Sequence, residues 1–148
     1  SVFSESMEWE RSFIFASHVG AMERQLENTI AYAKERRQFG QPIGKFESVS
    51  NRIADMKVRF EAARLHLHRA AWLKGSGEPA ALQSAMTKLL ISEAYVRSSL
   101  DAIKVFGGKG YLTGTGIERH MRDSTGGLLY TGTSDIQRVV IARLLGLG

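Results

Sequence analysis

An apolar stripe between positions 46 and 70 constrains the fold more than any other feature of this sequence. Its residues recur at alternating steps of three and four. They are Phe46, Val49, Ile53, Met56, Phe60, Ala63, Leu67 and Ala70. Such spacing keeps one face of an α-helix toward a partner helix, as in the seam of a helical bundle. The stripe therefore predicts a long helix, ended by Gly75-Ser76-Gly77, that packs against other helices.

Other segments of the chain also favour helices. A continuous helix is expected over residues 5–36, with Ser4 as its N-cap and the glycine and proline of residues 39–42 ending it. Its expected apolar face consists of Trp9, Phe13, Ala16, Gly20, Ile30 and Ala33. Another helix is expected over residues 78–106, with Pro79 in its first turn, where a missing donor costs nothing. Its expected apolar face consists of Leu82, Met86, Leu89, Val96, Leu100 and Ile103.

The C-terminal part of the chain is rich in glycine and predicts shorter elements. We expect a short helix over residues 117–122, a loop over residues 124–133 and a final helix over residues 134–145. No alternating strand pattern competes with this interpretation. Long helices joined by short links predict an all-α fold, an antiparallel four-helix bundle that forms one domain over residues 1–148.

Composition narrows the possible functions. The 148 residues include no cysteine, which excludes disulfides, thiolate metal ligands and cysteine nucleophiles. The formal net charge of +5 comes from basic residues interspersed with acidic ones, as is usual for solvated helix faces. No basic run with interleaved aromatic residues indicates a nucleic-acid partner. No apolar run approaches the ~20 residues that a membrane span needs, and the histidines lack the helical spacing of metal ligands.

Two glycine-containing motifs each allow two interpretations. Residues 106–111, FGGKGY, could approach a phosphate, but they fit neither the dinucleotide fingerprint nor the P-loop, so a glycine-ended helix is favoured. Residues 130–135, YTGTSD, place Thr133 or Ser134 at the start of the last helix. Either hydroxyl could cap that helix, and the amides of the same turn could bind an anion or a carbonyl. These last two interpretations are compatible.

Glu10 lies next to Trp9 and three residues before Phe13. A carboxylate against aromatic surface can have a raised pKa and act as a base. An exposed acidic residue in a first helical turn, stabilised by the helix dipole, is the more common situation. From these residues alone, the second interpretation of Glu10 is favoured.

Five motifs, taken together and in order, resemble one family. They are residues 32–43 (YAKERRQFGQPI), 53–56 (IADM), 106–111 (FGGKGY), 122–123 (RD), and 132–134 (GTS) followed by 141–143 (IAR). Their order and spacing are similar to those of the C-terminal helical domain of acyl-CoA dehydrogenases. The resemblance implies that domain's bundle, the cofactor FAD and the dehydrogenation of an acyl thioester. In that reaction a carboxylate takes the α-proton, and the β-hydrogen leaves as hydride to the flavin N5.

The resemblance also implies roles for individual residues. The positions that correspond to FAD contacts are Arg36, Gln38, Phe39, Lys104, Gly108, Thr133 and Asp135. The first three of these contact FAD from a neighbouring subunit in the family. The amide of Thr131 corresponds to a group that polarises the thioester carbonyl. Lys104 and Asp135 depart from the family pattern, which often has glutamine at the first position and glutamine or glutamate at the second. Lys104 could instead meet the FAD pyrophosphate as a point charge.

The identity of residue 131 decides where the base is expected. Many members of the family have a catalytic glutamate immediately before the Gly-Thr-Ser run, where this chain has Thr131, which is not a base at neutral pH. A branch resembling isovaleryl-CoA dehydrogenase has its base on the first helix of this domain, followed by arginine. Counted back from Gly20, that position is Glu10, and Arg11 follows it. The resemblance therefore implies that Glu10 is the general base and that Arg11 shapes the substrate side of its surroundings.

The resemblance extends to partners and assembly. The expected substrate is an acyl-CoA or an acyl group on a carrier protein, including an amino-acyl thioester, and the expected electron acceptor is an electron-transfer flavoprotein or oxygen. A homo-dimer or homo-tetramer is expected, in the cytoplasm of a bacterium or the mitochondrial matrix of a eukaryote. We expect the chain to be a fragment of a longer enzyme and inactive alone. The alternatives are a flavin-dependent oxidase or monooxygenase of the same fold and a non-catalytic helical oligomerisation module.

Overall fold

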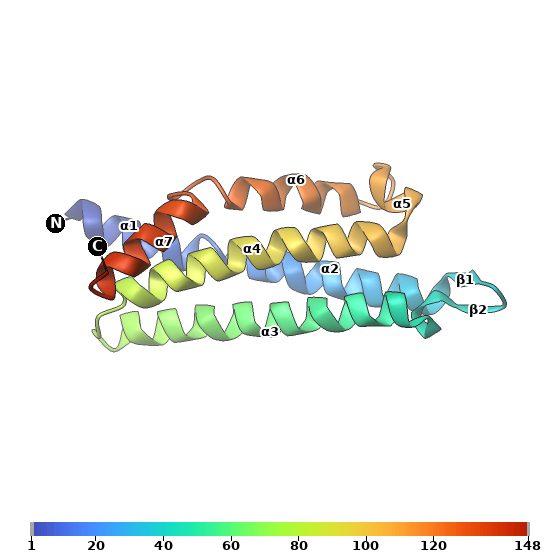
Figure 1. Ribbon diagram of the computed structural model, residues 1–148, viewed down its shortest axis with the longest axis horizontal. Coiled ribbons are helices and arrows are strands. Elements are labelled where there is room, and N and C mark those ends of the chain that lie inside the picture. Colours follow the sequence, from blue (N-terminus) through green and yellow to red (C-terminus); the bar gives the residue numbers. More distant parts are fainter. Residues whose placement is uncertain (1, 148) are drawn as a thin grey trace.

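The structure is a computed structural model that describes residues 2–147 as an elongated helical bundle (Figure 1). Its elements are α1 (Val2–Phe13), α2 (Ala16–Glu35), β1 (Arg37–Gln38), β2 (Gln41–Pro42), the 3-10 helix η1 (Ile43–Lys45), α3 (Glu47–Gly75), α4 (Ala81–Phe106), α5 (Gly108–Tyr111), α6 (Ile117–Gly127) and α7 (Ser134–Leu144). Four antiparallel columns are formed by α1 with α2, by α3, by α4, and by α6 with α7 (Figure 1). The predicted all-α bundle is therefore confirmed. Within the described residues, no helix is both long and apolar enough to cross a bilayer.

The α3 helix follows its apolar stripe, as predicted. Met56, Phe60, Ala63 and Ala70 are buried, and they face α2 and α4. Met56, Phe60 and Ala63 join Phe15 and other residues of α2, α4 and α6 in one continuous core. A helix with an apolar stripe on one side packs that side inward because burial of apolar surface drives association of the helices.

The first predicted helix was wrong in its continuity. It divides into α1 and α2 at residues 14–15, although backbone hydrogen bonds continue on both sides of the break, from Ile14 N to Glu10 O (3.2 Å) and from Val19 N to Phe15 O (3.1 Å). The break turns the ring of Phe15 fully into the core. The predicted apolar face was also wrong in part, because Trp9 is 51% exposed and the buried face of α2 follows Phe15 instead. That face continues through His18, Val19, Met22, Gln25, Leu26, Thr29 and Ala33.

The predicted face of the third helix was wrong in large part: Ile103 packs against the core, but none of the six predicted residues is buried. The helix α4 begins at Ala81, two residues after Pro79, and its leucines lie only half-buried or exposed. Its buried face combines many small or polar side chains with a few large apolar ones: Gln83, Ser84, Ala85, Thr87, Lys88, Ile91, Ser92, Ala94, Tyr95, Ser98, Ser99, Ala102, Val105 and Phe106. This helix is central and is contacted by α1, α2, α3, α5, α6 and α7. Small side chains allow close approach, and the hydroxyl of Ser92 is satisfied by donating to the Lys88 carbonyl at 2.9 Å.

The connections differ from the predicted ones in two places. Residues 37–42 form a two-stranded antiparallel hairpin, paired Arg37 with Pro42 and Gln38 with Gln41, where a simple turn was expected. The helix α6 continues to Gly127 and so includes residues predicted to lie in a loop. The final helix agrees with its prediction, and α4 ends at Phe106 before Gly107, whose φ of +61° suits glycine, as the glycine-ended interpretation requires.

Candidate active site

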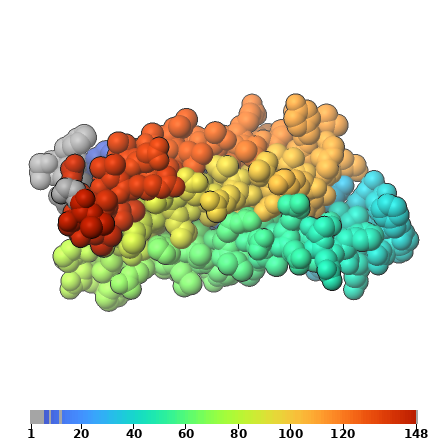
Figure 2. All heavy atoms as spheres, in the orientation of Figure 1, coloured from blue at the N-terminus to red at the C-terminus, as the bar shows by residue number. Residues whose placement is uncertain are grey.

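The residues singled out from the sequence fall into two groups at opposite ends of the bundle (Figure 1). One group lies at the end formed by α1 and the start of α7, and consists of Glu10, Arg11, Thr131, Thr133 and Asp135. The other lies at the hairpin end and consists of Arg36, Gln38, Phe39, Lys104 and Gly108. Figure 2 shows the hairpin and α7 at the two ends of the molecule. The structure thus separates the two groups along the bundle. Within the first group, Thr131, Thr133 and Asp135 lie in and beside one turn, and Glu10 and Arg11 lie on a different helix.

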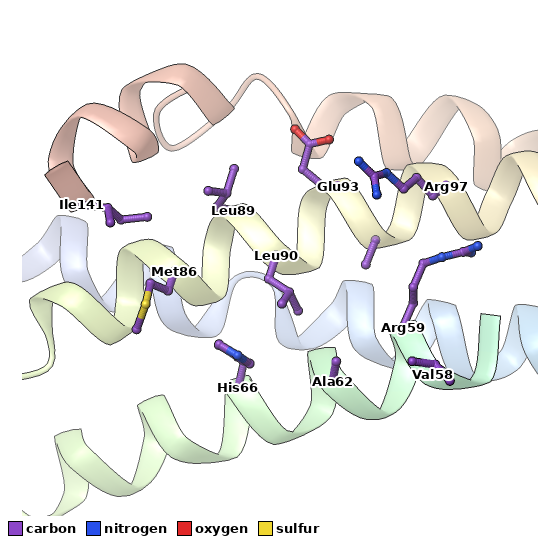
Figure 3. Close-up of a pocket in the computed structure, with 11 residues that line it drawn as sticks. Val58, Arg59, Ala62, His66, Met86, Leu89, Leu90, Glu93, Arg97 and Ile141 are labelled. Carbon is purple, nitrogen blue, oxygen red and sulfur yellow. The ribbon is translucent and has the colours of Figure 1, made fainter. Parts of the chain in front are cut away.

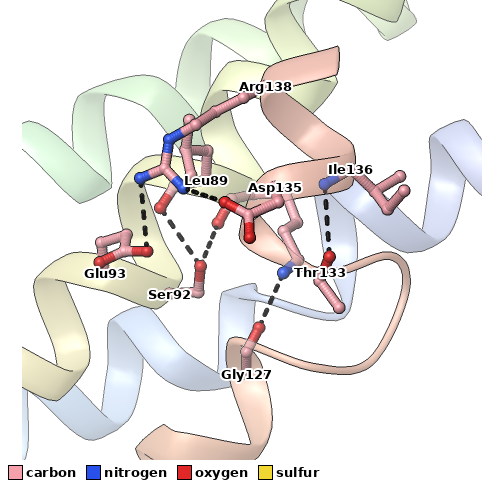
Figure 4. A network of polar contacts seen from close by, with 9 residues as sticks. Leu89, Ser92, Glu93, Gly127, Thr133, Asp135, Ile136 and Arg138 are labelled. Atoms are coloured by element: carbon pink, nitrogen blue, oxygen red, sulfur yellow. Dashed lines mark hydrogen bonds and ion pairs between the residues drawn. The ribbon is translucent and has the colours of Figure 1, made fainter. Parts of the chain in front are cut away.

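A tight turn precedes α7 and holds the first group in place. The Thr133 side chain is the N-cap: its hydroxyl accepts a hydrogen bond from the Ile136 amide at 3.3 Å (Figure 4). Of the two predicted candidates for the cap, Thr133 therefore fills the position. The Ser134 amide donates to the Leu128 carbonyl at 3.2 Å, which ties the end of the loop to its beginning. Thr131 has a φ of +55°, an unusual conformation for a β-branched residue.

The Thr131 amide has no hydrogen-bond acceptor within residues 2–147. Backbone amides are strong donors that are almost always paired with protein or water when they are not exposed. A donor left free in a turn of fixed shape is suited to a carbonyl or anionic group of a bound molecule. The predicted role of the Thr131 amide needs a free donor of this kind, and it stays a prediction.

Lys88 supports the same loop from the centre of the bundle. Its side chain is fully buried, and its ammonium donates to the Gly127 carbonyl at 2.8 Å, which fixes the C-terminus of α6. The ammonium also lies 5.5 Å from the centre of the Phe15 ring, a favourable cation–π distance. Burial is the main cause that lowers the pKa of Lys88 to about 8. Burial of a charged ammonium costs free energy. Its presence here therefore indicates that the position of the loop after α6 matters.

A polar and aromatic cluster joins the same loop to the start of α2. The Tyr130 hydroxyl hydrogen-bonds His18 Nε2, and the Tyr130 ring stacks on Phe15 with centroids 5.7 Å apart. Burial lowers the pKa of His18 and raises the pKa of Tyr130. Both side chains line a hollow of about 390 Å³ together with Tyr95 and Asp123. Because Tyr130 directly precedes Thr131, this cluster fixes the position of the turn relative to α2.

Glu10 and Arg11 lie on α1, at the same end as the Thr131 turn (Figure 1). Glu10 is exposed, whereas Arg11 is half-buried and its Nε has no hydrogen-bond partner in the described part of the chain. Five residues separate Glu10 from Phe15, which is about 7 Å along a helix. Phe15 in turn contacts the Tyr130 ring. Phe15 and Tyr130 thus link the segment that follows Glu10 to the residue that precedes Thr131.

The hairpin end presents exposed side chains whose internal contacts are local: Gln38 Nε2 donates to the Arg37 carbonyl at 2.8 Å, and the Phe39 ring lies 6.0 Å from that of Phe46. Phe39 is 92% exposed with a φ of +52°, and Arg36 forms no ion pair among the described residues. The stacked rings of Tyr32 and Phe106, with centroids 4.1 Å apart, bring the end of α4 beside the end of α2. Gly108 has open space where a Cβ would lie, so packing within the chain does not require glycine there. These exposed groups form a surface suited to an external phosphate-bearing ligand.

Asp135 also has a local role. Its Oδ1 accepts a hydrogen bond from Arg138 Nη1 at 3.0 Å, and Arg138 lies 3.7 Å from Glu93 of α4 (Figure 4). The acidic residue lies in the first turn of α7, where the helix dipole favours it. The ion pair accounts for aspartate at this departure from the family pattern without any ligand.

Sequence reasoning missed three side chains that shape this end of the bundle: His18, Lys88 and Gln137. Lys88 and Gln137 are fully buried polar residues, and His18 is 8% exposed. Neither residue type nor spacing signals these positions, because polar side chains on helices are normally exposed. The apolar residues near Lys88 in the sequence, Met86 and Leu89, led to the prediction that a different face of α4 is buried.

Comparison with known proteins relates this geometry to a family. A family model described as acyl-CoA dehydrogenase, C-terminal domain, matches residues 1–146. The L-prolyl-(peptidyl-carrier protein) dehydrogenase of Pseudomonas fluorescens is 53% identical, over 99% of this chain and 38% of that protein. The crystal structure of the prolyl acyl carrier protein oxidase AnaB is 52% identical with a TM-score of 0.97, over 99% of this chain and 39% of that one. The FAD complex of PigA is 49% identical with a TM-score of 0.96, over 99% and 38%. The chain therefore spans less than two-fifths of the length of these relatives.

Proposed function

This chain belongs to the acyl-CoA dehydrogenase family, as its C-terminal domain, and on that premise we propose that it forms part of an FAD-dependent enzyme that dehydrogenates an acyl thioester. Bound FAD would accept the hydride that leaves the β-carbon of the substrate. The protein groups bind and orient the thioester, stabilise its developing negative charge and remove its α-proton.

The free amide of Thr131 is the observation that carries this proposal. It lies in a turn of fixed shape, at the same end of the bundle as the carboxylate of Glu10. We assign the amide to the thioester carbonyl, because a hydrogen bond to that oxygen stabilises the enolate-like charge that forms as the α-proton leaves. Glu10 takes the proton, and Arg11 lies beside it on the substrate side. Removal of one such donor typically costs about a hundredfold or more in rate.

We propose that each FAD is shared by two subunits, as the resemblance to the family implies. The groups assigned to FAD lie in two separate parts of the chain, at the hairpin with the end of α4 and at the start of α7. We therefore assign Arg36, Gln38 and Phe39 to the FAD of a neighbouring subunit, with Lys104 and Gly108 beside its phosphates. Thr133 and Asp135 are assigned to the FAD of their own subunit. The unpartnered Arg36 and the open space at Gly108 support this assignment.

An apolar groove supports association with further copies. It has a volume of about 500 Å³ and lies between α3, α4 and α7. Val58, Met86, Leu89, Leu90 and Ile141 line it, with Glu93 and two arginines at one side (Figure 3). Apolar surface of this kind is usually covered in the assembled protein. A homo-dimer or homo-tetramer would cover it.

The relatives favour a carrier-protein substrate. The Pseudomonas protein is a dehydrogenase of a prolyl group on a peptidyl-carrier protein, so we propose an amino-acyl thioester on a carrier protein, with a prolyl group as the first choice. A second function, in which oxygen rather than an electron-transfer flavoprotein reoxidises the flavin, is favoured by the name oxidase given to AnaB.

We expect anaerobic reduction of the flavin in the full-length enzyme by prolyl-carrier protein to be at least about tenfold faster than by butyryl-CoA or isovaleryl-CoA. The reason is that a pocket built for one acyl group loses transition-state contacts with another. Stopped-flow absorbance of the flavin measures both rates. Faster reduction by the acyl-CoA would overturn the substrate assignment, and no reduction by any thioester would overturn the function. Consumption of oxygen during reoxidation would identify the oxidase.

The isolated chain of 148 residues is expected to retain no FAD and to be inactive. Only part of the cofactor surface is present, because the relatives are more than twice as long. Gel filtration after incubation with FAD, followed by the absorbance of the protein peak, measures retention. Tight stoichiometric FAD on this chain would contradict the expectation.

A further inference from the structure

The turn that carries Thr131 holds a conformation that its own residues do not favour. Thr131 has a φ of +55° and Gly132 a φ of +88°. Glycine adopts such angles freely, but threonine does not. A β-branched residue persists there only when surrounding contacts impose the conformation. The contacts around this turn therefore indicate what holds the Thr131 amide in its direction.

Gln137 of α7 makes those contacts. Its side chain is fully buried, and Nε2 donates to the Thr131 carbonyl at 3.1 Å and to the Gly132 carbonyl at 3.2 Å. Carbonyl oxygens only accept hydrogen bonds, so the amide group of Gln137 must present its NH₂ to them. One side chain thereby holds the two peptide units that follow the Thr131 Cα, and so fixes the backbone on the C-terminal side of the unit that carries the Thr131 amide.

Gly132 leaves the room that Gln137 occupies. A Cβ on Gly132 would lie 2.7 Å from Gln137 Nε2, closer than such atoms approach. Glycine at this position thus serves both the positive φ and the close approach of the glutamine. The turn and Gln137 therefore pack together as one unit.

Several buried polar atoms of this unit have no partner in the described residues. They are Thr131 Oγ1, Ser134 Oγ and Gln137 Oε1. Buried polar atoms are almost always paired, and each exception needs a reason. Stability does not explain these unpaired atoms, since unpaired polar atoms and an unfavourable φ both oppose folding. A functional requirement for the direction of the Thr131 amide does explain them.

We propose that Gln137 is a positioning residue that aims the Thr131 amide at the thioester carbonyl. This inference rests on the proposed function. Gln137 touches neither substrate nor cofactor in this account; it acts through the two carbonyls of the turn. The amide is then held in place before the substrate binds, so that its hydrogen bond to the developing oxyanion needs no rearrangement.

The test uses Gln137→Met in the full-length enzyme. Methionine keeps the length and approximate volume of glutamine but has no donor, so the turn is no longer held. We expect kcat for flavin reduction to fall about tenfold to a hundredfold, with KM and FAD content nearly unchanged. The infrared C=O frequency of a bound, non-reacting thioester analogue should return toward its solution value. That frequency measures how strongly the bound thioester carbonyl is polarised, and it does not depend on turnover.

Gln25→Leu is the matched control. Gln25 is also fully buried, its Nε2 donates to Ser99 Oγ at 2.9 Å, and its Oε1 likewise has no partner. It lies between α2 and α4, so loss of its hydrogen bond affects packing and leaves the turn intact. We expect this variant to keep the wild-type kcat and C=O frequency, whatever its melting temperature.

Gln137→Glu provides a second variant of unchanged shape. When protonated, its carboxyl group can donate one hydrogen bond to the turn; when ionised, it faces two carbonyls with no donor. The kcat of this variant relative to wild type should therefore rise as pH falls.

A wild-type pH profile in Gln137→Glu, or unchanged kcat and C=O frequency in Gln137→Met, would overturn the inference. Equal losses of kcat in Gln137→Met and Gln25→Leu would show that Gln137 has a purely structural role, and would also overturn the inference. Failure of the wild-type enzyme to reduce its flavin with any thioester would instead overturn the proposed function.

Discussion

Glu10→Gln in the full-length enzyme is expected to reduce flavin reduction by the thioester substrate about a thousandfold, while FAD stays bound. Glutamine has nearly the shape of glutamate but does not accept a proton. The α-proton of the substrate then has no acceptor, although the Thr131 amide can still bind the thioester carbonyl. Cofactor content should be unchanged, because Glu10 is not among the residues assigned to FAD and glutamine keeps its size. Stopped-flow flavin absorbance and the FAD-to-protein ratio measure the two quantities.

Glu23→Gln is the control for this change. Glu23 is an exposed acidic residue on the adjacent helix α2, so its replacement removes the same charge without touching the site. This variant should reduce its flavin at the wild-type rate. Normal flavin reduction by Glu10→Gln would remove Glu10 from the role of base. Because Thr131 occupies the other position where the family has a glutamate, the base would then lie outside this chain.

Two inactive variants are expected to restore activity to each other when their subunits are mixed. Arg36→Glu reverses a charge assigned to the FAD of the neighbouring subunit, and should lose FAD and activity. Glu10→Gln keeps FAD but lacks the base. A mixed dimer has one site with both changes and one site with neither, because the two residues lie at opposite ends of each chain. Co-expression with random pairing should therefore restore about a quarter of the wild-type sites.

A third subunit, which carries both Glu10→Gln and Arg36→Glu, controls for this result. When it is paired with Glu10→Gln subunits, every site lacks the base, and no activity should return. Purified mixed dimers with two different affinity tags allow activity to be measured per dimer. An absence of recovery in the mixed dimer of the two single variants would show that Glu10 and Arg36 serve the same site from one chain.

The fold could be predicted where a helix has one buried side. In α3, Met56 and Phe60 face the core while the other side is exposed, so apolar spacing identifies the face. In α4 the same reasoning failed, because a helix surrounded by neighbours needs small residues such as Ser84 and Ser99 for close packing. The break before Phe15 was missed because no glycine or proline marks it.

The candidate site could be predicted where its geometry is local. The cap by Thr133 depends on a hydrogen bond to a residue three positions away, and residue type alone narrowed the cap to Thr133 or Ser134. Lys88 contacts Gly127 across 39 positions, and no pattern in the sequence links those two residues. The separation of Glu10 from Arg36 likewise required the structure, since only the antiparallel course of α2, α3 and α4 shows which ends meet.

The mass of the acyl product after one anaerobic turnover of the full-length enzyme tests the central claim most directly. The carrier-bound acyl group is released and weighed before and after reaction with stoichiometric enzyme. Removal of the α-proton by Glu10 together with loss of the β-hydrogen as hydride predicts an acyl group lighter by two hydrogens, with a new double bond at the α,β position. An acyl group of unchanged mass, or one that has gained oxygen when air is admitted, would contradict this account.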